Sequence, residues 1–196
     1  RKRNLNMSAD ANIYTHKVAL GYLYNRSTGV RTITPDNING NWNATYSVTY
    51  RSRLDKKDQW SYQTATSYTY VNSVDLIGTT ATADRAVRSK VGSHHITESA
   101  LLRYNPNTKM DFYLKGNINY QNAQSDRENF KTINIYDFNY GLTTRIELPH
   151  AFQLSTDITI YSRRGYNDPS MNTNDLVWNA RLSKRFMHGN LVCMLD

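Results

Sequence analysis

The chain has few of the residues that cross-link or interrupt most compact folds: one cysteine, four prolines and nine glycines among 196 residues. A single cysteine, Cys193, excludes an intrachain disulfide framework. No run approaches the roughly 18 apolar residues of a spanning helix, so a helical membrane protein is excluded as well. At this length a single domain, 1–196, is the default expectation.

Patterns for catalysis and metal binding are also missing. His94 and His95 are neighbours on a predicted strand, so their rings point to opposite faces and are poorly placed to share a metal. The other histidines fall in predicted turns: His16, His150 and His188. No motif brings serine, histidine and aspartate together, and no glycine loop cradles a phosphate. We therefore expect no catalytic residue, no metal and no cofactor, and predict that the protein is not an enzyme.

Positive charge is in excess, with 24 Lys and Arg against 16 Asp and Glu, a formal net charge of +8. The cations are scattered, without a dense run or a recognition-helix pattern, so nucleic acid is not the expected partner. One hypothesis is that the cations beside the predicted long loops meet anionic lipid head groups. They are Arg85, Arg88, Lys90, Arg163 and Arg164.

Tyrosine and tryptophan are abundant, with 15 and 3 residues, and they recur with a period of two. In 41–51 the even positions hold Trp42, Tyr46 and Tyr50, whereas the odd positions are polar. This alternation predicts β-strands with one apolar and one polar face. Strands are predicted around 5–13, 18–24, 41–51, 60–70, 96–104, 110–121, 136–146, 152–161, 175–186 and from 191 onward. The fold class is therefore all-β, with about ten strands.

The links between these strands alternate in length. Short ones lie near 15–17, 54–58, 105–109, 148–151 and 187–190, and long ones at 25–40, 72–93, 121–129 and 163–174. This predicts an antiparallel up-and-down meander with next-neighbour pairing throughout. Tight turns at one end and longer loops at the other are typical of transmembrane β-barrels in the bacterial outer membrane. A soluble sandwich shows the same alternation of faces, however.

Strand length and aromatic placement favour the membrane barrel over the sandwich. Many segments reach the roughly 9–11 residues of a membrane strand. Large aromatic residues gather towards both ends of 41–51 and 60–70, as membrane interfaces select. We expect the large apolar side chains to lie exposed on the convex face: Trp42, Tyr46, Phe112, Ile118, Ile158 and Trp178. Cys193 is read as a lipid-facing or packed small residue.

The opposite face is predicted to form a wet, charged wall. Its charged members are Asp10, Lys115, Lys131, Asp137, Arg145, Glu147, Asp157, Arg181 and Arg185. Across the turn at 105–109, pairing of Tyr104 with Met110 would set Arg103 opposite Asp111. Two charges argue against a lipid-facing surface. Glu98 falls on the apolar face unless a bulge before Ala100 turns it inward, and Lys184 falls there close to a turn, where it could snorkel.

Several stretches resemble the C-terminal barrel of Bacteroidota outer-membrane proteins related to the TonB-dependent receptors: 72–77, 125–130, 138–141 and, most specifically, 161–166 leading into 171–184. The resemblance implies a late portion of a large monomeric barrel in the cell outer membrane. It also implies an N-terminal plug or carboxypeptidase-regulatory-like domain and an energy-coupling protein as partners, with uptake of large solutes. The chain is interpreted as a fragment truncated at both ends.

Three functions remain open from the sequence. The first is a barrel portion with a role in solute uptake or as a receptor, surrounded by outer-membrane lipid. The second is a non-transporting outer-membrane scaffold or surface-binding barrel. The third is a soluble β-rich binding module or adhesin. The solute itself is not encoded in any motif that we recognise.

Overall fold

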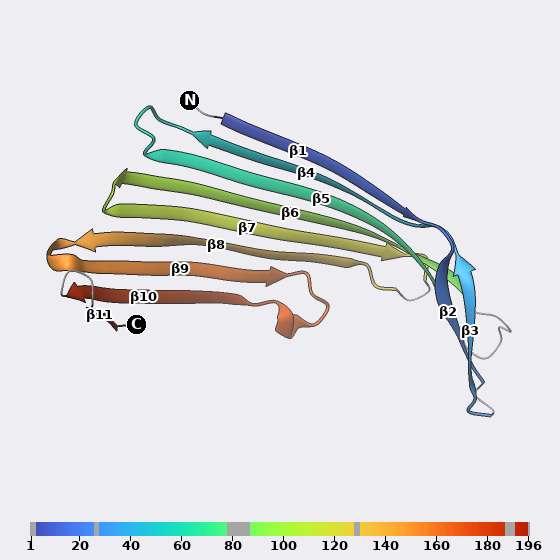
Figure 1. Cartoon of the computed structure of the whole chain (residues 1–196). Coiled ribbons are helices and arrows are strands. Elements are labelled where there is room, and N and C mark those ends of the chain that lie inside the picture. Colours follow the sequence, from blue (N-terminus) through green and yellow to red (C-terminus); the bar gives the residue numbers. More distant parts are fainter. Residues whose placement is uncertain (1–2, 26–27, 78–86, 128–129, 187–190, 196) are drawn as a thin grey trace.

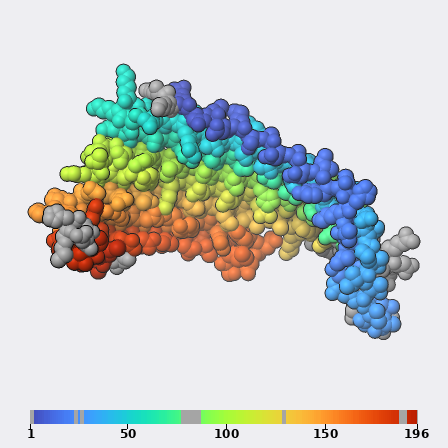
Figure 2. Space-filling model, viewed as in Figure 1, coloured from blue at the N-terminus to red at the C-terminus, as the bar shows by residue number. Residues whose placement is uncertain are grey.

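The chain forms one large open sheet and a small hairpin in a computed structural model that describes residues 3–25, 28–77, 87–127, 130–186 and 191–195 (Figures 1 and 2). The strands are β1 (Arg3–Tyr14), β2 (Lys17–Tyr24), β3 (Arg31–Ile38), β4 (Asn41–Arg53), β5 (Trp60–Ile77), β6 (Val87–Asn107), β7 (Met110–Ser125), β8 (Ile133–Leu148), β9 (Phe152–Arg164), β10 (Asn174–Phe186) and β11 (Leu191–Leu195). Two short 3₁₀ turns lie at Pro149–Ala151 and Pro169–Met171. The predicted all-β, antiparallel fold is confirmed.

The large sheet is antiparallel and has the order β1-β4-β5-β6-β7-β8-β9-β10-β11. From β4 onward every strand pairs with the next in sequence, as a meander does, and the sheet curves without closing into a barrel (Figure 1). No helix in the described ranges is long and apolar enough to cross a membrane.

The alternation of link lengths is confirmed within the large sheet. One end carries the short links 54–59, 108–109 and 149–151, and the other carries 15–40, 126–132 and 165–173, while 78–86 lies outside the described residues. The predicted short link at 187–190 lies outside the described residues. We call these two edges of the sheet the short-turn end and the long-loop end.

Next-neighbour pairing throughout was a wrong prediction for the first strands. β1 pairs with β4, and β2 pairs with β3 in a separate hairpin that projects from the long-loop end (Figure 1). The predicted turn at 15–17 bends the chain out of the sheet instead of reversing it, with His16 at a φ of 54°. The His16 amide donates to Asn39 Oδ1 at 2.7 Å, so both ends of the excursion are tied together.

β3 lies inside a segment that was predicted to be only a loop. Pro35 interrupts the strand pattern there, because proline cannot donate to a ladder and is confined to edge strands. In the structure β3 is an edge strand whose single partner is β2, with Leu20 opposite Pro35. Proline is tolerated in such a strand. β5 and β6 also continue well past their predicted ends, to Ile77 and from Val87.

The only buried apolar cluster among the described residues lies where the hairpin meets the sheet. Ala19 and Ile38 of the hairpin pack against Val74 of β5, with Leu76 partly buried beside them. Asn41 supports this contact, since its side chain donates to Val74 O at 3.2 Å and accepts from Val74 N at 3.0 Å. The rest of the sheet is a single layer.

The turn between β4 and β5 is organised by Asp55. Its carboxylate accepts the amide protons of Trp60 at 2.9 Å and Gln59 at 3.1 Å. The Trp60 hydrogen bond, which outweighs partial desolvation, holds the pKa of Asp55 below its ordinary value, and the Gln59 bond adds to it. Because the folded-state pKa is depressed, this contribution to the turn is fully present above the unfolded-state pKa of about 3.9 and is lost as pH falls through the folded value.

We predict that the Trp60 amide resonance titrates with a midpoint below about 3.9 in the wild-type protein and does not titrate in Asp55→Asn. The physical reason is that only an ionised Asp55 carboxylate makes the charge-assisted bond. NMR spectra collected from about pH 2 to about pH 6 would measure this midpoint. Asp58→Asn is the control, since Asp58 pairs with Arg53 and does not accept from Trp60. A midpoint at the ordinary value would contradict the prediction.

Candidate functional surface

The large sheet presents two chemically different faces. Directly paired residues share a face, so the register places the odd-numbered residues of β4 to β10 with the even-numbered residues of β1. We call this the polar face, and the opposite side the apolar face. On the polar face, for example, Asn119 pairs with Asp137. On the apolar face, Leu142 pairs with Ile158.

Aromatic rings form one group near each end of the apolar face. At the short-turn end Trp60 stacks on Tyr104 with ring centroids 4.2 Å apart, and Phe112 follows at 6.1 Å. At the long-loop end Tyr70 lies 4.9 Å from both Trp42 and His94. The prediction that large aromatics gather towards both strand ends is confirmed in β4, with Trp42 and Tyr50. In β5 it holds only for Trp60 and Tyr62, because the strand continues to Ile77 and leaves Tyr68 and Tyr70 near its middle.

The large apolar side chains on this face are uncovered, as predicted. Trp178 is 69% exposed, and Trp42, Tyr46, Ile118 and Ile158 are exposed as well. Phe112 is half-buried. That this face is the convex one stays a prediction. Only four apolar residues are buried in the described chain: Ala19, Ile38, Val74 and Ala123.

Glu98 stays on the apolar face, so the bulge that would have turned it inward is absent. Its pairing is regular, opposite Thr66 on β5 and Ile118 on β7. The carboxylate accepts hydrogen bonds from the hydroxyl groups of Thr64 and Thr66 on β5, whereas Ile118 on β7 offers no polar group. Two donors of this kind reduce the cost of a carboxylate among apolar side chains.

Lys184, the other charge on the apolar face, lies over aromatic rings. Its Nζ is 4.5 Å from the centre of the Phe152 ring and 4.8 Å from that of Phe186. Such cation–π contacts attract the ammonium group to the faces of the two rings. Cys193 pairs with Lys184 from β11 and is exposed on the same face.

The polar face carries a connected charge network around Asp157. Its Oδ2 accepts from Lys115 Nζ at 2.6 Å and from Thr143 Oγ1 at 2.5 Å, and its Oδ1 accepts from Thr159 Oγ1 at 2.8 Å. These residues come from β7, β8 and β9, so one carboxylate joins three strands. Both members of the ion pair are about one-third exposed, so the network remains accessible from the polar face.

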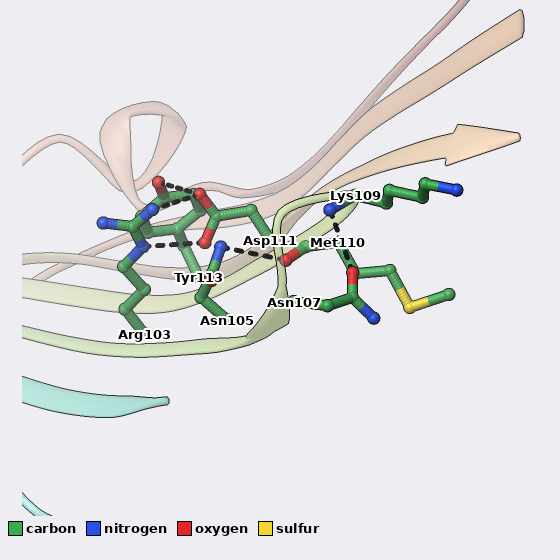
Figure 3. Close-up of polar contacts among 7 residues, drawn as sticks. All are labelled: Arg103, Asn105, Asn107, Lys109, Met110, Asp111 and Tyr113. Atoms are coloured by element: carbon green, nitrogen blue, oxygen red, sulfur yellow. Dashed lines mark hydrogen bonds and ion pairs between the residues drawn. The ribbon is translucent and has the colours of Figure 1, made fainter. Parts of the chain in front are cut away.

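A second network lies beside the turn between β6 and β7 (Figure 3). Arg103 donates to Asp111 through Nε at 2.7 Å and Nη2 at 2.5 Å, and Tyr113 donates to the same carboxylate at 2.6 Å. The predicted register was wrong by two residues, because Tyr104 pairs with Phe112 and Arg103 with Tyr113. A bulge between Tyr104 and Asn107 gives β6 one more residue than the facing part of β7. Arg103 and Asp111 nevertheless share the polar face and meet diagonally.

Most of the other predicted wall residues lie on the polar face. Arg185 pairs with Glu147 at 3.2 Å, Arg145 donates to Gln153 at 3.2 Å, and Asp137 accepts from Tyr166 at 2.7 Å. The positions Asp10 and Arg181 share this face through their partners Thr45 and Ser155. Lys131 is the exception, since it precedes β8 in a loop.

Two of the cations beside the long loops contact main-chain oxygens. The Arg88 guanidinium donates to Asn39 O, and Arg164 Nη1 donates to Thr173 O at 2.8 Å. Arg163 lies 3.9 Å from Asp137. Arg85 lies outside the described residues. These contacts join segments at the long-loop end. The hypothesis that these five cations, Lys90 included, meet anionic lipid head groups stays a prediction.

The described histidines do not form a cluster. His94 bonds Tyr68 on the apolar face, with Nδ1 2.8 Å from the hydroxyl oxygen, whereas His95 pairs with Gln121 on the polar face. The expected division of this pair between faces is confirmed. His16 and His150 lie in links, and His188 lies outside the described residues. Within the described ranges no three histidine, cysteine or acidic side chains are arranged to hold a metal ion.

Comparison with known proteins adds no relative: no family model matches the chain, and no curated protein does. The inference of function therefore rests on the two faces of the sheet.

Sequence reasoning did not single out Arg51 and Arg53, which share the polar face near Arg103. The signal available was the spacing of two residues between them, which places both on one face of a strand.

Proposed function

We propose that the chain forms part of the wall of a transmembrane β-barrel in a bacterial outer membrane. The uncovered apolar face of a one-layer sheet carries this proposal. A monomer in water rarely exposes a contiguous apolar patch beyond a few hundred Å². Here the exposed apolar side chains extend from Leu5 on β1 to Trp178 on β10. Lipid is a solvent in which such a face is stable.

The total accessible surface supports the same proposal. The chain exposes 13992 Å², whereas a folded monomer of 22.7 kDa is expected to expose about 9500 Å². The excess, close to half of the expected value, follows from the near absence of a core. A closed barrel would pair the open edges β1 and β11 with further strands, and lipid would cover the apolar face.

The spacing of the aromatic groups fits the thickness of a membrane. Tyr104 and His94 mark the two groups on β6 and are ten residues apart. Ten residues span about 33 Å along a strand, which is about 25 Å along the membrane normal at a tilt of roughly 40°. The apolar band of outer-membrane barrels is also about 25 Å tall. The aromatic rings would then lie at both interfaces.

The kind of barrel is proposed from the resemblance of 161–184 and the other stretches named above. We propose a TonB-dependent-receptor-like protein that takes up solutes or serves as a receptor, with a plug domain and an energy-coupling protein as partners. The ion-paired polar face around Asp157 supports a hydrated interior in contact with solute or plug. The short-turn end would face the periplasm and the long-loop end the exterior.

The proposal predicts alternating contact with lipid along β9 and β10. Single cysteines at Ile158 and Trp178, and matched ones at Ser155 and Asn179, are labelled with an environment-sensitive fluorophore in a Cys193→Ser background of the full-length protein. In phosphatidylcholine vesicles, nitroxide-labelled lipid is expected to quench the first pair strongly and the second pair weakly. The reason is that successive residues of a membrane strand face lipid and interior in turn.

Equal quenching at all four positions, or recovery of the protein without lipid as a stable soluble monomer, would contradict the proposal. The Ser155 and Asn179 variants act as controls for labelling and insertion. The native cysteine must be removed first, because Cys193 is exposed on the apolar face and would add its own signal.

A further inference from the structure

A hollow of about 700 Å³ opens at the short-turn end of β4 to β7, mainly on the polar face. Its lining includes Arg51, Arg53 and Arg103 of the polar face and Arg3 of the opposite face, and among the described residues it includes no carboxylate. A volume of this size is within the range of small-molecule sites, about 300–1000 Å³. We call it the arginine hollow.

Strand register brings three of these arginines together. Arg53, Ser61 and Arg103 form one row across β4, β5 and β6, and Arg51 lies in the adjacent row with Gln63. Residues two apart on a strand are separated by about 7 Å, and the outer members of a three-strand row by about 10 Å. Arg51, Arg53 and Arg103 thus line one hollow, and these spacings suit a small organic ion.

The charges of the arginine hollow are not balanced. Arg53 pairs with Asp58, and Arg103 pairs with Asp111. In the described chain no carboxylate lies within ion-pair distance of Arg51. Asp111 uses two of the five N–H groups of Arg103, so it holds this side chain in place and leaves donors free.

We propose that the arginine hollow binds a small organic anion that carries phosphate or carboxylate groups. Arg51 is the principal contact, because its planar fork of donors matches both groups and no protein carboxylate competes for it. Arg53 and Arg103 flank the anion, and Gln63 and Ser61 supply neutral hydrogen bonds. The site lies on the opposite face from the proposed lipid contact and does not depend on it.

Calorimetric titration of detergent-solubilised full-length protein tests the site, with pyrophosphate and citrate as separate probes. At least one probe should bind, and the preferred one identifies the group recognised. Arg51→Gln should weaken that binding by roughly ten- to a hundredfold, as expected for lost hydrogen bonds to a charged group. Arg51→Lys should retain part of the affinity. Arg163→Gln, the same change of charge at the long-loop end, should leave it unaltered.

Absence of binding by both probes overturns the inference, and so does equal affinity in Arg51→Gln and wild-type protein. Unfolding temperatures of the two proteins show whether the variant is folded. If Arg51→Gln fails to fold, Gln63→Leu replaces it, and unchanged affinity in that variant counts against the site. Binding to the wild type should also weaken as salt is added, because the contact is between charges. Insensitivity to salt would refute it.

Discussion

Replacing Leu142 with arginine is expected to destabilise the membrane-inserted protein by about 2–4 kcal/mol, a roughly 30- to 700-fold change in the folding equilibrium. Leu142 lies near the middle of β8, between Leu114 and Ile158, and is 42% exposed on the apolar face. In water such a position would accept an arginine at little cost. In lipid the guanidinium would lose its hydration at the membrane centre. Urea titration of the protein refolded in vesicles measures the difference.

The matched control is Asn119→Arg, which places the same charge in the middle of the polar face. Asn119 is exposed and lies beside Asp137 on β8. A hydrated interior accepts the arginine there, so the urea midpoint should stay within experimental error of wild type. If Leu142→Arg folds as well as Asn119→Arg, the apolar face is not in contact with lipid and the proposed function falls.

Alternation along each strand was predictable from sequence because it is a local property. The placement of Trp42, Tyr46 and Tyr50 on one face needs only the period of two, and the structure confirms it. Link lengths were predictable for a similar reason, since turns such as 54–59 are short and rich in polar residues. Together these local signals were sufficient for the all-β antiparallel fold.

Register was harder to predict because it depends on interactions between strands. The error of two residues between β6 and β7 arose mainly at the turn, because β6 continues to Asn107 and only 108–109 link the strands where 105–109 was predicted. The bulge between Tyr104 and Asn107 shifts the register by one residue, and no local pattern announces it. The pairing of β1 with β4 depends on whether 17–38 pairs with itself or with the large sheet. Periodicity is the same in both cases, so the sequence could not distinguish them.

The polar networks depend on strand register, so they are as hard to predict from sequence as the register itself. Lys115 and Asp157 were both expected on the polar face, but their contact spans β7 to β9 and requires two correct registers. The arginine hollow needs β4, β5 and β6 aligned to bring Arg51 near Arg103. Single charges on a face were therefore predictable, and the sites that they build together were not.

Gly141→Ala is expected to destabilise the sheet by about 1–3 kcal/mol, although alanine adds only one methyl group. A Cβ at Gly141 would lie 2.4 Å from Ile158 O and 2.6 Å from Thr159 Oγ1. Main-chain atoms of β9 cannot rotate away, so β8 and β9 must separate locally. Thr159 is 1% exposed and donates to Asp157, so moving it also disturbs the network that joins three strands. The shift in the urea midpoint measures the loss.

Gly116→Ala provides the comparison, because Gly116 lies on the neighbouring strand β7 and its added Cβ would come no closer than 3.9 Å to Asn139 O. That is ordinary van der Waals contact, and the loss of backbone freedom in the unfolded chain should stabilise this variant by about 0.4–1 kcal/mol. The two substitutions are chemically identical, so their opposite effects would report the close approach of β8 and β9. Equal midpoints for both variants would show that the strands do not pack this tightly at Gly141.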